Sequence, residues 1–300
     1  MTGRDAVLLV DKPEGPTSHD VVRAARRALG TRRVGHTGTL DPFASGLLIL
    51  CVGRATRLVE YFHHLPKSYE AGIVFGESRD TDDRTGTVTE RGEIGPGLDA
   101  ARLEAALTAS LGESEQRPPD YSARQKGGRR AHEAARAGEP LALEARPIEV
   151  RGARLLDWSP PVARVAYEVS TGTYVRALAR DLGAGLGCPA HLGTLRRTRI
   201  GPFEASDAVG VPDIAWDAPA SLSPLAALAW LPARELTAEE RTAVGYGQAI
   251  ATGEVAPPAV AVAGLGPGEL PVVLHAAGEL VAVGRRADEA IRPDKVFDAN

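Results

Sequence analysis

The stretch from Arg32 to Leu50 constrains the fold of this chain more than any other part of the sequence. It runs into an uninterrupted apolar segment, Leu47–Val52, which predicts a buried strand. Glycines in the preceding loop let the backbone approach a ligand closely. Pro42 biases Asp41 away from the helical region, so we expect its carboxylate on an extended or turn backbone. A catalytic group is often mounted in this way, but Asp-Pro beside glycines is also ordinary turn chemistry.

The composition is that of a soluble globular protein. Of the 300 residues, 43% are hydrophobic and 25% are charged, which allows one large domain or two ordinary ones. The two cysteines, Cys51 and Cys188, form no zinc-type spacing with histidines, so we expect no structural metal. Val7–Val10 is too short for a signal peptide and no run approaches a membrane span, so we expect a cytoplasmic protein without membrane contact.

Positive charge is concentrated in three arginine-rich groups. The formal net charge of -4 by itself argues mildly against a nucleic-acid partner. Arginine binds phosphate bidentately and stacks on bases, so three such groups around one site favour a phosphate-binding surface over a merely solvated one. The groups are Arg23, Arg26, Arg27, Arg32 and Arg33; Arg124, Lys126, Arg129, Arg130, His132 and Arg136; and Arg196, Arg197 and Arg199.

The hydrophobic pattern predicts an α+β fold with a mixed, mostly antiparallel sheet, because strands outnumber helices and the two do not alternate regularly. Beyond about Trp230, proline and glycine separate short apolar strands, which indicates a small β domain. The expected strands are 6–10, 47–52, 68–75, 147–158, 163–170, 192–199, 259–262, 272–275 and 280–283. The expected helices are one capped by Thr17 or Ser18 and ended by Gly30, and others at 56–63, 100–111, 131–137 and 173–186.

Two polar segments stand outside this pattern. The acidic segment Glu77–Gly86 contains Asp80 and Asp82, which permits a metal loop or a phosphatase-like nucleophile. The calcium-loop pattern is broken within it, so we favour a solvated loop or one that meets RNA. The segment Glu113–Gly128 is long and polar, which is typical of a functional or mobile part of a domain.

The stretch around Asp41 resembles the signature of the TruB-type tRNA pseudouridine synthases. The matching residues are Gly35-His36-Thr37-Gly38-Thr39-Leu40-Asp41-Pro42 and Ala44-Ser45-Gly46-Leu47-Leu48. The resemblance implies that Asp41 is the essential catalytic residue. It also places His36 where it fills the space left by a flipped base or stacks on a neighbouring base.

Further motifs similar to those of the same family occur along the chain. They are Leu8–Pro13, Lys67-Ser68-Tyr69, Gly172–Arg176, Leu192–Arg197, the tRNA-gripping segment Pro119–Gly138, and Leu280–Gly284 with Ile291–Phe297 in a PUA domain. The resemblance implies that Asp41, Tyr69 and Arg176 are catalytic. It implies that the substrate is bound by His36, Tyr174, Leu195, Lys12, Arg129 and Arg130. Arg176 would keep Asp41 ionised, Tyr69 would stack on the uracil, and Leu195 would form an apolar wall.

By this resemblance the chain has a pseudouridine synthase fold. The catalytic domain would span residues 1–229, with an RNA-gripping insertion at about 113–138, and a small β-barrel-like PUA domain would span residues 230–300. The implied reaction converts uridine 55 in the T loop of tRNA to pseudouridine after the base has been flipped out. Substrate and product are isomers, so no cofactor and no metal are expected. Nothing in the sequence demands more than a monomer, so we expect a monomer.

Two other functions are compatible with the residues. A module that binds or folds tRNA would not need Asp41 for its function. A phosphotransferase with Asp80 or Asp82 as nucleophile would depend on a metal ion. The chain also departs from the family twice in the gripping segment, since Lys126 stands one place late and His132 replaces a tyrosine. These departures concern RNA contacts and not the reaction.

Overall fold

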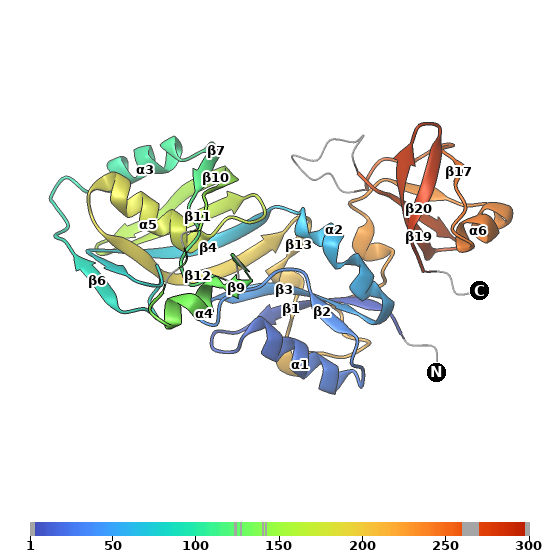
Figure 1. The fold of residues 1–300 in the computed structure, drawn as a ribbon, viewed down its shortest axis with the longest axis horizontal. Helices are drawn as coiled ribbons and strands as arrows, with labels where there is room; N and C mark the ends of the chain where they lie inside the picture. Colours follow the sequence, from blue (N-terminus) through green and yellow to red (C-terminus); the bar gives the residue numbers. More distant parts are fainter. Residues whose placement is uncertain are drawn as a thin grey trace. The chain divides into compact units, whose positions relative to one another are not determined.

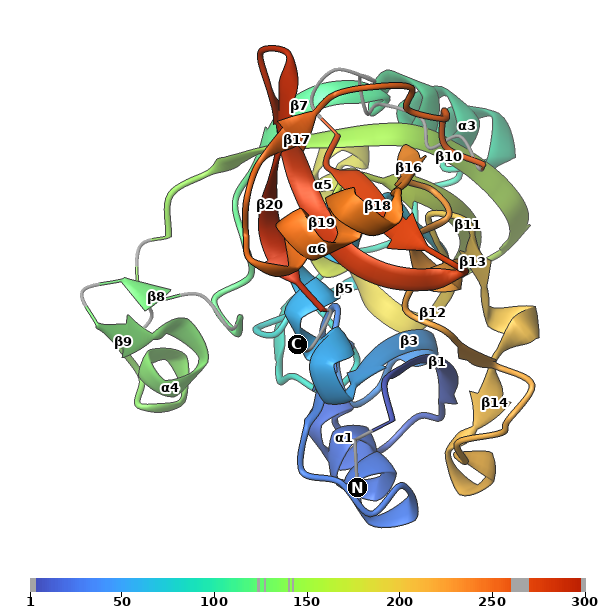
Figure 2. The same ribbon diagram turned by 90° about the vertical axis from the view of Figure 1, so that its right-hand side faces the viewer.

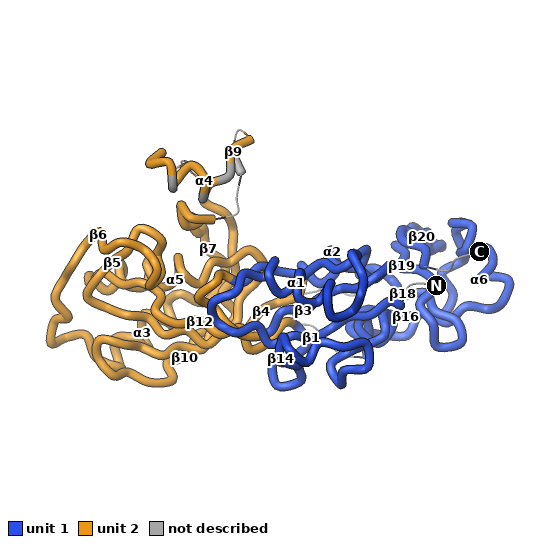
Figure 3. The backbone as a smooth tube through the Cα atoms, turned by 90° about the horizontal axis from the view of Figure 1, so that it is seen from below, with its two compact units in different colours: residues 1–40, 47–63, 201–300 blue, residues 41–46, 64–200 orange. Residues whose placement is uncertain are grey.

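The computed structural model describes residues 4–122, 125–126, 128–139, 141, 143–259 and 270–297. The chain divides into two compact units: unit 1 contains residues 1–40, 47–63 and 201–300, and unit 2 contains residues 41–46 and 64–200 (Figure 3). Each unit thus joins segments that are far apart in the sequence. The domain boundary expected near residue 230 stays a prediction.

Unit 2 contains an antiparallel sheet, two small ladders and three helices among its described residues (Figure 1). Its elements are β4 (Lys67–Phe75), β5 (Glu77–Arg79), β6 (Val88–Arg91), α3 (Ala100–Ala109), β7 (Gly112–Gln116), β8 (Gln125–Lys126), β9 (Arg129–Arg130), α4 (Ala131–Arg136), β10 (Arg146–Ser159), β11 (Val162–Val169), α5 (Val175–Leu186) and β12 (Ala190–Ile200). The sheet has the order β12-β4-β11-β10-β7, and all neighbours are antiparallel. This confirms the expected mostly antiparallel sheet.

Helices α3 and α5 cover the sheet of unit 2, where α3 packs on β10 and α5 packs on β12 (Figure 1). In α3, Leu103 and Leu107 lie one turn apart and are buried, which is the spacing of an amphipathic helix. Helix α5 ends at Gly187, whose φ of 71° suits the left-handed cap. Strand β11 alternates buried and more open residues as the sequence predicted, with Val165 and Tyr167 on the buried face. In Figures 2 and 3, β9 and α4 project from this sheet.

Unit 1 begins with a small sheet, two α-helices and a 3-10 helix. Its elements are β1 (Ala6–Lys12), α1 (Ser18–Ala28), β2 (Val34–His36), β3 (Ser45–Val52, entering from unit 2), the 3-10 helix η1 (Gly53–Leu58), α2 (Val59–His63), β14 (Val209–Gly210) and β15 (Ser221–Leu222). Thr17 caps α1 in a capping box with Asp20, as the sequence predicted. Val21, Val22 and Ala25 of α1 are buried in one core with residues of β1 and β3.

The C-terminal part of unit 1 forms a second sheet with the order β16-β18-β19-β20-β17. Its elements are β16 (Ala233–Glu235), α6 (Ala238–Gly245), β17 (Ile250–Ala251), β18 (Val272–Ala276), β19 (Glu279–Ala287) and β20 (Ala290–Val296). The strands expected at 272–275 and 280–283 are confirmed by β18 and β19. The strand expected at 259–262 lies almost entirely outside the described residues. The sheet and α6 share a core that includes Val244, Leu274 and Ile291.

Two segments differ from the expectation of polar loops. Glu77–Arg79 forms β5, and Asp83 in the following turn is only 4% exposed, whereas Asp80, Arg84 and Thr85 are exposed, so the segment 77–86 is only partly a solvated loop. The segment expected to start an insertion at residue 113 begins instead with β7, which pairs with β10. Only Gln116 of β7 is buried, because β7 lies at the sheet edge. An edge strand needs no apolar face, so the polar sequence of β7 gave no sign of a strand.

Candidate active site

Asp41 lies at the start of the short segment 41–46 of unit 2. The N–H of Ala44 donates a hydrogen bond of 3.1 Å to the Asp41 carbonyl, which closes a turn around Pro42. Phe43 and Ala44 are buried and anchor this turn, and the guanidinium of Arg84 lies over the Phe43 ring. The Asp41 side chain remains 36% exposed. A rigid backbone thus presents a carboxylate that a substrate can reach.

Gly46 allows this segment to join the sheet of unit 2. Its φ is +104°, and a Cβ at this position would lie 2.2 Å from the Arg197 carbonyl oxygen. Ser45 and Gly46 pair with Arg196 and Arg197 of β12. The same ladder row continues from Arg197 to Tyr69 in β4. The register therefore puts the end of the Asp41 segment, Arg197 and Tyr69 at one level of the sheet, and Leu195 lies two residues away from Arg197 on β12.

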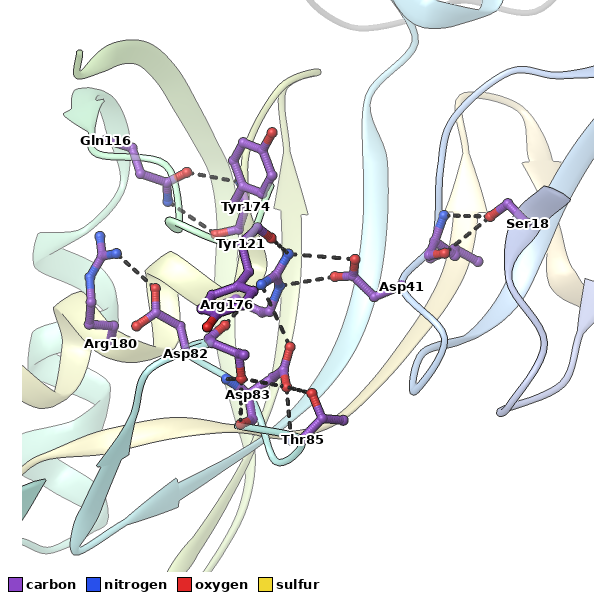
Figure 4. A network of polar contacts seen from close by, with 12 residues as sticks. Ser18, Asp41, Asp82, Asp83, Thr85, Gln116, Tyr121, Tyr174, Arg176 and Arg180 are labelled. Carbon is purple, nitrogen blue, oxygen red and sulfur yellow. Dashed lines mark hydrogen bonds and ion pairs between the residues drawn. The ribbon is translucent and has the colours of Figure 1, made fainter. Parts of the chain in front are cut away.

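Arg176, at the start of α5, forms an ion pair with Asp41 (Figure 4). Its Nε lies 3.0 Å from Asp41 Oδ2, although the Nε–H lacks hydrogen-bond geometry towards any acceptor. Nη1 donates to the Thr81 carbonyl at 2.8 Å, and Nη2 donates to the Tyr121 carbonyl at 3.0 Å. The Arg176 side chain is 5% exposed. Backbone carbonyls on two segments therefore fix the cation that faces Asp41.

Asp83 is a second carboxylate beside Arg176, and the sequence reasoning missed it. Its Oδ2 lies 3.6 Å from Arg176 Nη1 (Figure 4). Its Oδ1 accepts hydrogen bonds from Thr81 Oγ1 at 2.9 Å, from Thr85 N at 2.9 Å and from Thr85 Oγ1 at 2.6 Å. The Asp83-x-Thr85 pattern is a signal for this local turn. No spacing in the sequence, however, connects residue 83 with residue 176.

Asp82 points to the other arginine of α5, Arg180. Arg180 Nη1 donates to Asp82 Oδ2 at 2.8 Å, and the Asp82 side chain is 14% exposed. Burial raises the pKa of Asp82 to about 6, against the opposing attraction of Arg180 and Arg176. The neighbouring Asp80 accepts a hydrogen bond from Thr87 N at 2.7 Å. Both carboxylates are engaged in holding the turn, which does not favour the phosphotransferase hypothesis.

The segment after β7 is bound to the beginning of α5. The side chain of Gln116 donates to the Tyr174 carbonyl at 3.1 Å and accepts from the Tyr174 N–H at 2.9 Å. Arg180 Nη2 donates to the Arg117 carbonyl at 2.9 Å. Together with the Arg176–Tyr121 bond, these contacts hold residues 116–121 against α5 (Figure 4).

The other candidate residues take varied positions. Tyr69 and Leu195 are 8% and 7% exposed, as core residues of β4 and β12. Tyr174 is half-buried and precedes the first turn of α5. His36 is half-buried at the end of β2, in unit 1.

Lys12 requires a correction, because we expected it to bind substrate. Its side chain is fully buried, and Nζ donates to the carbonyls of Pro13 and Pro16 at 2.9 and 2.8 Å. A buried ammonium needs such acceptors, so Lys12 holds the turn before α1.

The expected phosphate-binding surface is only partly present. Arg197 is 1% exposed, and Arg199 pairs with Glu168 at 2.9 Å, so the third arginine group is not an open cationic surface. In the first group, Arg27, Arg32 and Arg33 are exposed. In the second group, Arg129 is exposed and pairs with Glu139. The side chains of Arg130, Lys126, His132 and Arg136, and the whole of Arg124, lie outside what the structure describes.

The described residues contain neither a metal-binding cluster nor a membrane-spanning helix. Within them, no three side chains of His, Cys, Asp or Glu are grouped so that they could hold a metal ion. Within them also, no helix has the length and apolar character needed to cross a membrane.

The fold of this chain is that of the pseudouridine synthases. A chain in the crystal structure of a Cbf5–Nop10–Gar1 complex matches with a TM-score of 0.74 and 27% identity, over 98% of this chain and 85% of that chain. A second, from an H/ACA RNP bound to a substrate RNA containing 2′-deoxyuridine, matches with a TM-score of 0.73 and 25% identity, over 98% of this chain and 85% of that chain. The C-terminal sheet is accordingly PUA-like.

Sequence comparisons define the family more narrowly. Residues 26–175 match the model of the TruB family pseudouridylate synthase N-terminal domain, and residues 176–218 match that of the tRNA pseudouridylate synthase B C-terminal domain. The tRNA pseudouridine synthase B of Parasynechococcus marenigrum is 40% identical, over 100% of both chains. That of Thermobifida fusca is 46% identical, over 82% of this chain and 86% of the relative. The chain belongs to the TruB family of pseudouridine synthases, and it is an RNA-binding isomerase.

Proposed function

We propose that this enzyme converts uridine 55 in the T loop of tRNA to pseudouridine, with Asp41 as the reacting carboxylate. The observation that carries the proposal is the ion pair between Asp41 and the nearly buried Arg176, on a turn that leaves Asp41 accessible. The curated relatives bear the name tRNA pseudouridine synthase B, which supports tRNA as the substrate. The T stem-loop, a monomeric enzyme and a cytoplasmic location are parts of the same proposal.

The reaction breaks the N1–C1′ bond of uridine and forms a C5–C1′ bond. The proton that leaves C5 is balanced by the proton that N1 gains, so atoms and electrons are conserved without an oxidant or reductant. Asp41 serves this exchange either by attacking C1′ or by taking a proton from C2′. In both routes the carboxylate must be ionised and correctly placed, and Arg176 supplies the positive charge beside it.

The surrounding residues take the following roles in this proposal. Tyr69 stacks on the uracil and takes part in proton transfer, and Leu195 forms an apolar wall on the adjacent strand. The target base must leave its stack, which costs a few kcal/mol. His36 occupies the vacated space or stacks on a neighbouring base. Tyr174, Arg129 and Arg130 contribute to substrate binding.

Tritium release from tRNA labelled at C5 of uridine tests the proposal. Wild-type enzyme and Asp41→Asn are compared in the presence of a chelator, with Arg164→Gln as a control. Arg164 is exposed and pairs only loosely with Glu70, at 3.4 Å. We expect release by wild type and by the control, and none by Asp41→Asn. A folded wild type that binds tRNA without release would favour the tRNA-binding module instead.

A further inference from the structure

Two arginines one helical turn apart on α5 bind the same two segments of unit 2 (Figure 4). Arg176 donates to the Thr81 carbonyl of the turn 80–85, which we call the acidic turn, and to the Tyr121 carbonyl after β7. Arg180 donates to the Asp82 carboxylate of the same turn and to the Arg117 carbonyl. Helix α5 thus links the two segments twice, once through the arginine that meets Asp41 and once through Arg180.

The guanidinium of Arg180 is held from three sides. Nε donates to Asp181 at 2.8 Å, Nη1 to Asp82 at 2.8 Å and Nη2 to the Arg117 carbonyl at 2.9 Å. Its planar fork gives each of these bonds a fixed direction, which a flexible ammonium could not do. Arg180 is therefore built to define the distance between the acidic turn and the segment after β7.

Asp82 is held in a backbone conformation that needs support. Its φ is +57°, which is uncommon for a residue other than glycine. Its N–H donates to the Arg79 carbonyl at 3.0 Å, and its carbonyl accepts from Leu192 N in β12 at 3.0 Å. Strained residues persist where their surroundings determine them, and they concentrate at functional sites. On either side of Asp82, Thr81 supplies a carbonyl to Arg176 and Asp83 supplies a carboxylate.

We propose that Arg180 and Asp82 form a positioning pair that holds Arg176 in the orientation in which it meets Asp41. The proposal rests on the proposed function, since Arg176 matters only if Asp41 reacts. Neither member of the pair contacts the substrate. Their effect passes through the acidic turn and the residues 117–121, which carry the carbonyls that direct the Arg176 guanidinium.

The test measures the single-turnover rate at saturating tRNA, the Kd for tRNA and the melting temperature. Asp82→Asn is the first variant, because asparagine tolerates a positive φ and only the charge is removed. Arg180→Gln, Arg180→Lys and the double variant Asp82→Asn/Arg180→Gln complete the set, and Arg164→Gln is the control. Arg180 retains Asp181 and the Arg117 carbonyl when Asp82 is changed, so Asp82→Asn leaves no orphaned cation.

We expect Asp82→Asn to slow the chemical step by about tenfold or more, up to about 10²-fold, with an unchanged Kd and no fall in melting temperature. Arg180→Lys should restore only part of the rate that Arg180→Gln loses. The double variant should be no slower than Arg180→Gln, because both changes break one interaction. If wild type is active and Asp82→Asn is equally fast, this inference is overturned while the proposed function stands. The same holds if the rate losses of the two single variants multiply in the double variant. A wild type without pseudouridine formation would overturn the proposed function and this inference with it.

Discussion

Arg176 and Asp41 are 135 residues apart in the sequence, yet Arg176 Nε lies 3.0 Å from Asp41 Oδ2. The contact depends on three separate elements of unit 2. Helix α5 supplies the cation, the segment 41–46 supplies the anion, and backbone carbonyls of Thr81 and Tyr121 direct the guanidinium. A change in any one of them should alter the position of the Arg176 guanidinium relative to the Asp41 carboxylate.

Replacing Arg176 by lysine should slow pseudouridine formation by about 10²-fold. A lysine ammonium is a compact charge on a flexible stem, so it cannot hold two carbonyls and a carboxylate in fixed directions. We expect single-turnover kinetics to show the loss while tRNA binding is nearly unchanged. A lysine variant at wild-type rate would mean that the charge alone matters.

Asp83→Asn should destabilise the protein, because the buried Arg176 then loses one of its two carboxylate neighbours. The expected loss in the free energy of unfolding is about 1–3 kcal/mol. Denaturant titration of wild type and variant measures it, and Asp157→Asn on the exposed part of β10 is the control. Equal stability of the Asp83 and Asp157 variants would contradict the role given to Asp83.

Gly46→Ala should be among the most damaging small substitutions in unit 2. The added methyl would lie 2.2 Å from the Arg197 carbonyl oxygen, and the φ of +104° is unfavourable for alanine. We expect the free energy of unfolding to fall by about 3 kcal/mol or more. Gly185→Ala serves as the matched control, since nothing lies within 4 Å of its added Cβ and alanine favours the helix. The control should match or exceed wild-type stability in a thermal melt.

Asp82 should make stability depend on pH in a defined direction. Its pKa is raised from 3.8 to about 6 by burial, so the folded state favours the protonated carboxyl. The stability that protonated Asp82 contributes to the folded state is fully present below pH 3.8 and is lost as the pH rises through about 6. Charged groups that act on Asp82 are Arg180 and Arg176, which favour the ionised form, and Asp181, which opposes it.

Asp82→Asn removes this titration. Relative to wild type, the variant should therefore gain stability between pH 4 and pH 7, by an amount on the order of 2–3 kcal/mol. Denaturant titrations of both proteins at several pH values give the difference directly. A difference that is constant across this range would show that Asp82 titrates normally.

The exposed arginines of the first group should carry part of the salt dependence of tRNA binding. Replacing Arg27, Arg32 and Arg33 by glutamine should make the plot of log K against log salt shallower, by about 0.7–0.9 for each phosphate that the protein no longer neutralises. Filter binding at several salt concentrations measures the slope. Arg197 is buried, so we do not count it among the arginines that reach phosphate. A slope unchanged by the triple substitution would contradict the phosphate-binding role of the first group.

Local patterns in the sequence predicted most elements of the fold. The capping box at Thr17, the alternation in β11 and the glycine that ends α5 depend on neighbours within a few residues. The contiguous motif around Asp41 likewise indicated the family and the carboxylate that we propose reacts. These features are encoded locally, so they can be read without knowing which segments meet.

Long-range pairing decided the rest. Asp82 and Asp83 look solvated in the sequence, but α5 brings Arg176 and Arg180 to them and makes their burial possible. Lys12 and Arg197 look like surface cations, but the turn after β1 supplies carbonyl acceptors to Lys12, and Arg197 lies in β12 between Gly46 and Tyr69. A charged side chain is buried only when its partners are in place, whether they come from the adjoining turn, as for Lys12, or from a distant helix, as for Asp82 and Asp83. The sequence thus determined most of the elements, the family and the candidate carboxylate Asp41, whereas only the tertiary structure decided which charged groups surround that carboxylate.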